Sequence, residues 1–346
     1  MRWGWKAVLG IAVSALLIWW VLSDVDPRQV WAEVRGANLW LLLLAVAITT
    51  SGFLIRALRW GVFLHPVRPG TRLHSRFAAV NIGFGLNNVL PARMGEFARA
   101  WSFARLESVT VSATFGSIVV ERFMDLLAVF GLLLVAVLHP SFPGSATVGG
   151  RSLESLLPGV AVVLFATVSV LLVSLLFPNT LVSLARRVSP HLPGRAGHLI
   201  SELLEEFLRG LGALRSPRLL FSSVIWSFAF WAWNGLSFLV GFWAFGIEQG
   251  YVTALFVQAI IALGVAVPAA PGYVGTFQAA AVIALHEVYG VAEGPTLAFA
   301  FGYHLGSFLP VTLLGLWYAA RVGLSVSDLR WAGGVGPSAT RELRRR

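Results

Sequence analysis

The chain has 346 residues and a net charge of +10, and 57 % of its residues are apolar while 12 % are charged. Soluble domains contain roughly 45–50 % apolar and about 25 % charged residues, so this composition excludes a water-soluble globular protein. Disulfide bonds, zinc sites built on thiolates and thiol nucleophiles are also excluded, because the sequence contains no cysteine.

Six apolar segments are long enough, or nearly long enough, to cross a hydrocarbon core, which requires roughly 20 helical residues. They are Ala7–Ser23, Leu39–Leu64, Thr110–Leu138, Leu156–Phe177, Leu219–Phe245 and Thr296–Trp317. No cleavage site of small residues follows the first segment, so we interpret it as an uncleaved span. The sequence therefore predicts an all-α, polytopic helical bundle in the cytoplasmic membrane.

Two further apolar stretches, Phe77–Leu90 and Ala254–Val267, are too short to cross the bilayer alone. Each contains about 14 residues, which is roughly 21 Å of helix. Each runs into a break rich in Pro and Gly and is followed by a second helix-compatible segment, so we predict two re-entrant hairpins. The residues that mark the breaks are Pro91, Gly95, Pro268, Pro271, Gly272 and Gly275.

Basic residues indicate the side from which each hairpin enters the membrane. Arginines flank the first hairpin on both sides, at positions Arg68, Arg72, Arg76, Arg93, Arg99 and Arg105. The mouth of the second hairpin contains neither Lys nor Arg. Because basic residues stay on the cytoplasmic side, we expect the first hairpin to enter from the cytoplasm, the second from outside, and both termini to be cytoplasmic.

The two breaks also resemble each other in sequence. If the second break contains three additional residues, the aligned positions are Pro91-Ala92, Gly95, Phe97 and Ala100 with Pro268-Ala269, Gly275, Phe277 and Ala280. Two similar hairpins of opposite orientation are typical of an inverted repeat, which in many transporters places a binding site near the middle of the membrane.

Three ionisable residues, Glu121, Arg122 and Asp125, lie within the apolar segment Thr110–Leu138. An unpaired charge near the centre of a bilayer costs at least roughly 2.5–3.5 kcal/mol, so these side chains need partners. Their spacing puts them on one side of a helix, where they can form an internal ion network. Such a network either binds a charged or phosphorylated group in a hydrated site, or only holds the broken helix in place.

The first hairpin adds polar residues to the same region, namely Asn87, Asn88, Arg93, Glu96 and Arg99. Because the hairpin directly precedes the charged helix in the sequence, we expect Glu96 or Asn87 to face Arg122.

The second half of the chain contributes fewer polar candidates. Gln278 stands just after the Gly275 break, where free backbone N–H groups at a helix start would attract phosphate. His304 lies within the last span, where a lone histidine is more often a hydrogen-bonded packing residue than a proton carrier.

The sequence contains few of the residues that intramembrane enzymes use. Asp125 is the only aspartate within an apolar run, which disfavours a two-aspartate protease, and there is no Gly-x-Ser-x-Gly motif. Spacings of histidine and acidic residues that would bind a metal are also missing, so we predict no metal site, no cofactor and no enzyme.

Charge and amphipathic patterns predict contacts with the membrane surface. Residues 1–325 form the expected membrane domain, and residues 326–346 a basic, disordered cytoplasmic tail that touches anionic lipid. Arg195–Leu214 is amphipathic and is expected to lie flat on the cytoplasmic interface. Since the arginines lie between apolar runs, anionic lipid rather than nucleic acid is the expected partner.

Three ordered motifs resemble the membrane domain of lysylphosphatidylglycerol synthases, which are also described as flippase-like membrane proteins. The motifs are Asn87-Asn88-x-x-Pro91-x-Arg93-x-Gly95-Glu96-x-x-Arg99, Glu121-Arg122-x-x-Asp125 and Pro271-Gly272-x-x-Gly275-x-x-Gln278. The resemblance extends from about Leu39 to Arg321. Where the family often has an acidic residue after the second Gly break, this chain has Gln278, which argues against a proton-coupled role there.

The resemblance implies a function in lipid movement. In bifunctional members this domain moves an aminoacylated phospholipid from the inner to the outer leaflet, and a soluble synthase domain follows it. This chain ends at Arg346, so the resemblance implies a flippase-like role without lysyl transfer.

Our leading hypothesis is a translocase for a phospholipid or lipid-linked head group. Arg93, Arg99 or Arg122 would take the phosphate, and the carboxylates of Glu96, Glu121 and Asp125 would hold these arginines. Two alternatives remain, an accessory subunit that scaffolds a lipid- or glycan-modifying enzyme and a transferase that acts on a lipid-linked sugar.

Overall fold

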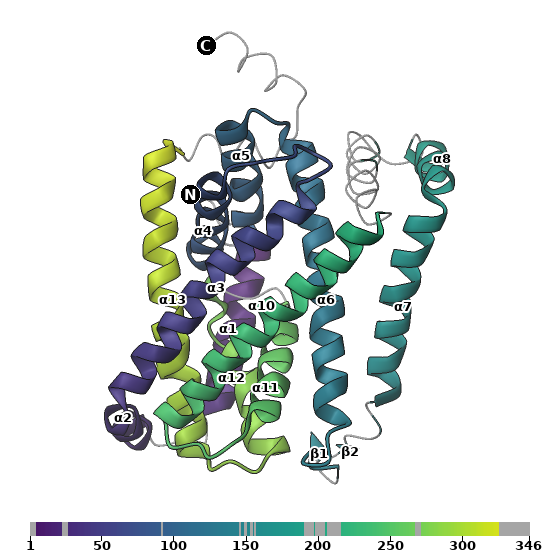
Figure 1. Ribbon diagram of the computed structural model, residues 1–346. Helices are drawn as coiled ribbons and strands as arrows, with labels where there is room; N and C mark the ends of the chain where they lie inside the picture. Colours follow the sequence, from purple (N-terminus) through teal and green to yellow (C-terminus); the bar gives the residue numbers. More distant parts are fainter. Residues whose placement is uncertain are drawn as a thin grey trace.

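The computed structural model describes residues 5–22, 27–90, 93–144, 147–148, 151–152, 155, 157–189, 197, 205, 216–266 and 271–324. In these residues the chain is an all-α membrane bundle (Figure 1). The described β-structure is one short antiparallel ladder of β1 (Thr147–Val148) and β2 (Arg151–Ser152).

A helix covers each of the six predicted spans. These helices are α1 (Trp5–Leu22), α3 (Leu39–Phe63), α6 (Val111–Val137), α7 (Leu157–Leu176), α10 (Pro217–Ala244) and α13 (Glu293–Val322). Among the described residues, α3, α10 and α13 are long and apolar enough to cross a membrane. The 27 residues of α6 would also reach across, but three of them are ionisable.

Both predicted hairpins form, and each helix ends near its expected break. The first hairpin consists of α4 (Leu73–Val89) and α5 (Gly95–Glu107), which pack against each other. The second consists of α11 (Tyr251–Gly264), a 3₁₀ turn η5 (Pro271–Tyr273), α12 (Thr276–Ala281) and a π-helical turn η6 (Val282–Val288). Pro91 and Pro268 lie outside the described residues.

The two hairpins enter the bundle from opposite ends (Figure 1). The first opens at the end where α8 lies, and the second opens at the end where β1 and β2 lie. Their tips meet in the middle, since α4 contacts η5. This arrangement is the one that the arginine distribution and the inverted repeat predicted.

Two short amphipathic helices that we did not predict lie at the two ends of the bundle. α2 (Pro27–Gly36) and α8 (Pro178–Val188) cross the direction of the long helices in Figure 1. The predicted interfacial helix Arg195–Leu214 and the predicted tail 326–346 fall outside the described residues, apart from two isolated positions of the former.

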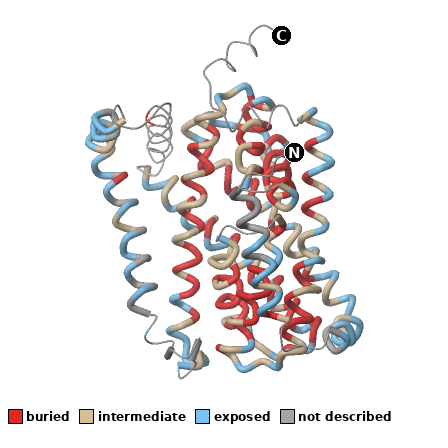
Figure 2. The backbone as a smooth tube through the Cα atoms, turned by 180° about the vertical axis from the view of Figure 1, so that it is seen from behind, coloured by how far each residue is buried: buried red, intermediate tan, exposed pale blue. Residues whose placement is uncertain are grey.

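Buried residues concentrate in the central helices, whereas α7 stands at the edge of the bundle (Figure 2). One apolar cluster joins α10, α11 and α13, and another joins α3, α4, α5 and α6. α4 and α13 approach very closely, because a Cβ added at Gly85 would lie only 2.8 Å from the Cα of Gly315. The missing side chains therefore allow the first hairpin to pack tightly against the last span.

Candidate functional site

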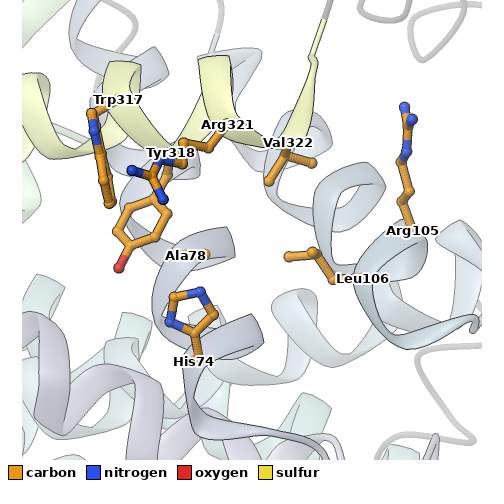
Figure 3. Close-up of a pocket in the computed structure, with 8 residues that line it drawn as sticks. All are labelled: His74, Ala78, Arg105, Leu106, Trp317, Tyr318, Arg321 and Val322. Carbon is orange, nitrogen blue, oxygen red and sulfur yellow. The ribbon is translucent and has the colours of Figure 1, made fainter.

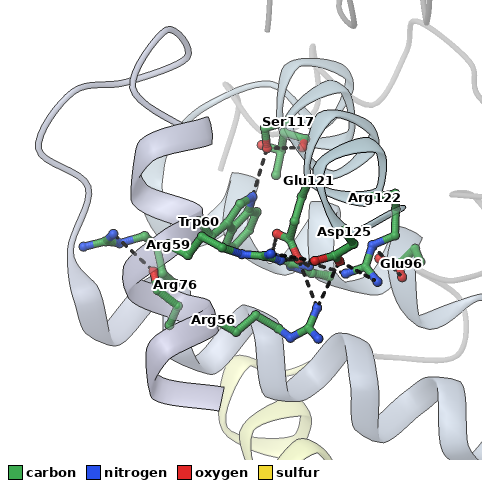
Figure 4. A network of polar contacts seen from close by, with 12 residues as sticks. Arg56, Arg59, Trp60, Arg76, Glu96, Ser117, Glu121, Arg122 and Asp125 are labelled. Atoms are coloured by element: carbon green, nitrogen blue, oxygen red, sulfur yellow. Dashed lines mark hydrogen bonds and ion pairs between the residues drawn. The ribbon is translucent and has the colours of Figure 1, made fainter. Parts of the chain in front are cut away.

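The ionisable residues of α6 form a buried network with arginines from two other helices (Figure 4). Glu121 is completely buried, and its carboxylate binds four arginines at 2.6–3.3 Å. These are Arg56 and Arg59 from α3, Arg99 from α5 and Arg122 from α6 itself. The internal ion network predicted from the spacing on α6 is present, and it is larger than predicted.

Asp125 lies one turn further along α6 and completes the network. Its Oδ1 is 2.5 Å from Nη1 of Arg59, and its Oδ2 is 3.4 Å from Nη1 of Arg122. The indole Nε1–H of Trp231, on α10, donates to the same carboxylate at 3.0 Å. The network thus ties α3, α5, α6 and α10 together at one level of the bundle.

Aromatic rings enclose the arginines that are buried most deeply. The guanidinium of Arg56 lies 4.4 Å from the ring centre of Phe84 and 4.1 Å from that of Phe230. The guanidinium of Arg99 lies 3.9 Å from the ring centre of Trp60. Ring faces carry negative partial charge, so they favour these cations where water is excluded.

The network carries an excess of one positive charge when all of its groups are ionised. Four arginines face three carboxylates, because Glu96 of α5 joins it through Arg122 at 3.9 Å. Burying an uncompensated charge is costly, so this composition favours an anion as an additional partner. In the described part of the chain, no group of three or more His, Cys, Asp or Glu is placed to hold a metal ion.

Arg122 is the member of the network through which an anion can reach it. Its side chain is 35 % exposed, whereas the other three arginines are at most 8 % exposed. Glu96 faces Arg122 as expected, and its Oε2 has no hydrogen-bond partner. Arg99 differs from our expectation, because it is buried and both of its terminal nitrogens bind Glu121. In the structure, Arg99 is therefore a member of the buried network and less accessible than Arg122.

The tips of the two hairpins meet beside Arg122, the partly exposed arginine of the network. Arg93 has a positive φ of 54°, and its Nη2 donates to the carbonyl oxygen of Val265 at 2.5 Å. Its guanidinium also lies 5.9 Å from the ring centre of Tyr273 on η5. Tyr273 also lies near Glu96 and Arg122. We call Arg93, Glu96, Arg122 and Tyr273 the hairpin junction.

The two asparagines of the first break bind protein groups. Asn87 does not face Arg122, because its Oδ1 accepts from the backbone N–H of Gly95 at 2.8 Å and so caps the start of α5. Asn88 donates from Nδ2 to Oγ1 of Thr312 on α13 at 2.8 Å. Both asparagines therefore stabilise the broken segment of the first hairpin.

In the second hairpin, the side chain of Gln278 binds protein groups at the break. Its Oε1 accepts from the backbone N–H of Gly275 at 2.9 Å, so this side chain occupies the helix start that we expected to attract phosphate. Its Nε2 lies 3.1 Å from Nδ1 of His304, which stacks on Phe277 at 4.3 Å. Gln278 and His304 thus fasten the hairpin to α13, and His304 is the hydrogen-bonded packing residue that its isolation indicated.

Sequence reasoning missed Arg56 and Arg59, although they contribute half of the arginines in the network. A signal was available, since two arginines three residues apart within an apolar segment lie on one helix face. Their counterparts are Glu121 and Asp125, which are separated from them by more than 60 residues and show a similar spacing. The two arginines and the two carboxylates thus neutralise each other's charges inside the membrane.

Residues 7–315 match the family described as the lysylphosphatidylglycerol synthase TM region. The chain belongs to this family. The matched residues include both hairpins and the whole charged network. The resemblance that the three motifs suggested is therefore confirmed for this TM-region protein.

Relatives of this TM-region protein are distant in sequence, and two of the three described next match it over nearly their full length. It is 25 % identical over 330 residues to the UPF0104 membrane protein PH1989 of Pyrococcus horikoshii, which covers 89 % of the chain and 93 % of the relative. A UPF0104 membrane protein of Methanothermobacter thermautotrophicus is 23 % identical, with 89 % and 91 % covered. Glycosyltransferase AglD of Haloferax volcanii is 24 % identical over 85 % of the chain, which spans only 50 % of AglD.

Proposed function

We propose that this TM-region protein is a translocase for a phospholipid or lipid-linked head group, with its binding site at the hairpin junction. One observation carries the proposal. The tips of two oppositely oriented hairpins meet beside a partly exposed arginine of a network that has an excess of positive charge. Helices broken in this way line cavities near the membrane midplane in many transporters.

Arg122 and Arg93 would take the phosphate. Glu121 at 2.8 Å and Asp125 at 3.4 Å orient the Arg122 guanidinium, so little conformational freedom is lost when an anion binds it. A guanidinium can present two parallel N–H groups to a phosphate, which gives a stronger bond than a single ammonium contact. Glu96 is 3.9 Å away and partly exposed, so it can yield its place to the phosphate.

Movement of the head group across the membrane requires the hairpin tips to separate. The described polar contact between them is a single hydrogen bond, from Arg93 to the backbone of Val265. A phosphate that binds Arg93 would remove this bond. The substrate itself would thereby help to open the junction through which it passes.

Leaflet exchange in reconstituted vesicles tests this proposal. Vesicles with the purified protein receive head-group-labelled phospholipids of several classes, and a membrane-impermeant quencher reports how much label reaches each leaflet. We expect the protein to accelerate exchange of at least one lipid, Arg122→Gln to abolish the acceleration, and Arg122→Lys to retain part of it. The control Arg218→Gln changes an exposed arginine at the start of α10 and should have no effect. No acceleration over the whole panel would overturn the proposal.

A second candidate is a transferase that acts on a lipid-linked sugar. It is favoured by the name of AglD and by Glu96, a partly exposed carboxylate whose Oε2 has no hydrogen-bond partner. For this candidate, Glu96→Gln would remove a specific glycolipid product from cells while leaflet exchange in vesicles stays unchanged. If Glu96→Gln leaves the glycolipids of the cell unaltered, the transferase is excluded.

A further inference from the structure

A second site lies at the end of the bundle where the first hairpin opens (Figure 3). It is a cavity of about 470 Å³ between α4, α5 and α13, and we call it the end cavity. The side chains that give it its character are His74, Arg105, Trp317, Tyr318 and Arg321. Its volume lies in the range of small-molecule sites, roughly 300–1,000 Å³. None of the residues of the hairpin junction lines it.

The end cavity is basic. Arg105, Arg321 and His74 contribute to its lining, and no carboxylate does. Among the described residues neither arginine forms an ion pair, while the guanidinium of Arg321 lies 4.5 Å above the ring of Trp317. Figure 3 shows His74, Tyr318 and Arg321 on one side of the cavity and Arg105 on the other. The Arg105 guanidinium also lies 5.2 Å from the ring centre of Trp101. An anion in the cavity would therefore face Arg321 on one side, and the longer-range field of Arg105 from the other helix.

The surface next to the end cavity is apolar and exposed. Leu309, Leu313 and Trp317 are 50 %, 58 % and 46 % exposed, and they follow one another at every fourth residue of α13. The same row ends at Arg321, one turn beyond Trp317. Residues four apart lie on one face of a helix, so this apolar row leads along α13 to the basic cavity. Tryptophan is enriched at this level of membrane proteins, where hydrocarbon meets head groups.

We infer that the end cavity binds the phosphate group of an anionic phospholipid whose acyl chains lie along this row of α13. The basic lining accounts for the charge of the ligand, and the exposed apolar row accounts for its acyl chains. A free phosphate or glycerol phosphate would use the basic lining of the end cavity but would leave the apolar row of α13 without a ligand. This site is separate from the hairpin junction, and it stands whether or not the protein moves lipid between leaflets.

Binding of a short-chain phosphatidylglycerol to the purified full chain tests this inference. Lipid bound to the protein is counted by native mass spectrometry over a range of lipid concentrations. Since each arginine near a membrane surface contributes about fivefold to the affinity for anionic lipid, Arg105→Gln with Arg321→Gln should weaken binding roughly 30-fold. The matched control Arg35→Gln with Arg218→Gln removes two exposed arginines elsewhere and should not weaken it.

Two further measurements distinguish a lipid from a soluble phosphate as the ligand, and a loss of binding from a loss of folding. Glycerol 3-phosphate and inorganic phosphate should bind much more weakly than the lipid, and Leu313→Gln should weaken lipid binding without affecting either soluble anion. Arg105→Lys with Arg321→Lys keeps the charge and should retain most of the lipid affinity. Unchanged lipid affinity after Arg105→Gln with Arg321→Gln, or equal affinity for glycerol 3-phosphate, would overturn the inference.

Discussion

Neutralising Glu121 should destabilise the protein more than any other single change of charge in the network. Its carboxylate is completely buried and pairs with four arginines at 2.6–3.3 Å. Glu121→Gln preserves the shape of the side chain but leaves four arginines with two carboxylates. Removing one partner of a buried ion pair costs about 3–5 kcal/mol, because the other charge stays buried without compensation.

Glu96→Gln is the matched control, because it removes the same charge from the same network. Glu96 forms a single ion pair with Arg122 at 3.9 Å, beyond hydrogen-bond distance and at the edge of the network, so its loss leaves the short pairs of Glu121 in place. Contacts of this kind contribute about 0–1 kcal/mol. The free energy of unfolding, measured by titration with denaturing detergent in mixed micelles, should thus fall several times further in Glu121→Gln than in Glu96→Gln.

A double variant tests the physical reason for this difference. Arg99→Met with Glu121→Gln removes both members of the shortest ion pair of Glu121, whose Nη2 and Oε2 are 2.6 Å apart. Because Arg99 is then no longer buried without its partner, the double variant should be more stable than Glu121→Gln alone. If Glu121→Gln lowers the free energy of unfolding by less than about 1 kcal/mol, the network does not hold the helices together and our reasoning is refuted.

Three other changes test the hairpins. Thermal unfolding in detergent measures the first two, and hydrogen exchange measures the third. Asn87→Ala leaves the buried N–H of Gly95 without its acceptor and should cost about 1–3 kcal/mol. Gly85→Ala forces α4 away from Gly315, only 2.8 Å from the new Cβ, and should cost about 1–3 kcal/mol through overpacking. Arg93→Gln removes the bond between the hairpin tips, and we expect hydrogen exchange of the tip amides to accelerate while global stability changes by less than about 1 kcal/mol.

Controls for these changes are available in the same chain. Gly159→Ala also adds a methyl group to a helical glycine, but nothing lies within 4 Å of the new Cβ, so it should not destabilise the protein. Asn88→Ala removes an amide from the same turn as Asn87 and frees a hydroxyl, which can still donate to its own helix. Equal losses in Asn87→Ala and Asn88→Ala would contradict the capping role.

The sequence predicted the hairpins well because their breaks depend on local chemistry. Several prolines and glycines close together interrupt a helix, whereas single ones such as Pro310 are tolerated within α13, so α4 ends at Val89 and α11 at Gly264, close to the predicted positions. The entry of the two hairpins from opposite ends could also be predicted, because arginines flank the first hairpin and are missing from the mouth of the second.

The partners of buried charges were harder to predict, because they depend on contacts between distant segments. The need of Glu121 for a partner is visible in the sequence, but its binding of Arg56 and Arg59 follows from the packing of α3 against α6. Gln278 shows the converse problem, because only the geometry of the break reveals that its side chain caps Gly275. Polarity inside the membrane thus indicates that a residue has a partner, and the fold decides which one.

Crosslinking of the hairpin tips in membrane vesicles tests the central claim most directly, and the chain suits this experiment because it has no native cysteine. Arg93→Cys with Val265→Cys places one thiol on each tip, where the native residues are hydrogen-bonded. A short bifunctional thiol reagent should link this pair efficiently within one chain and should not link the control pair Arg218→Cys with Val265→Cys. Equally low yields for both pairs would contradict the claim that two opposed hairpins meet beside the arginine network.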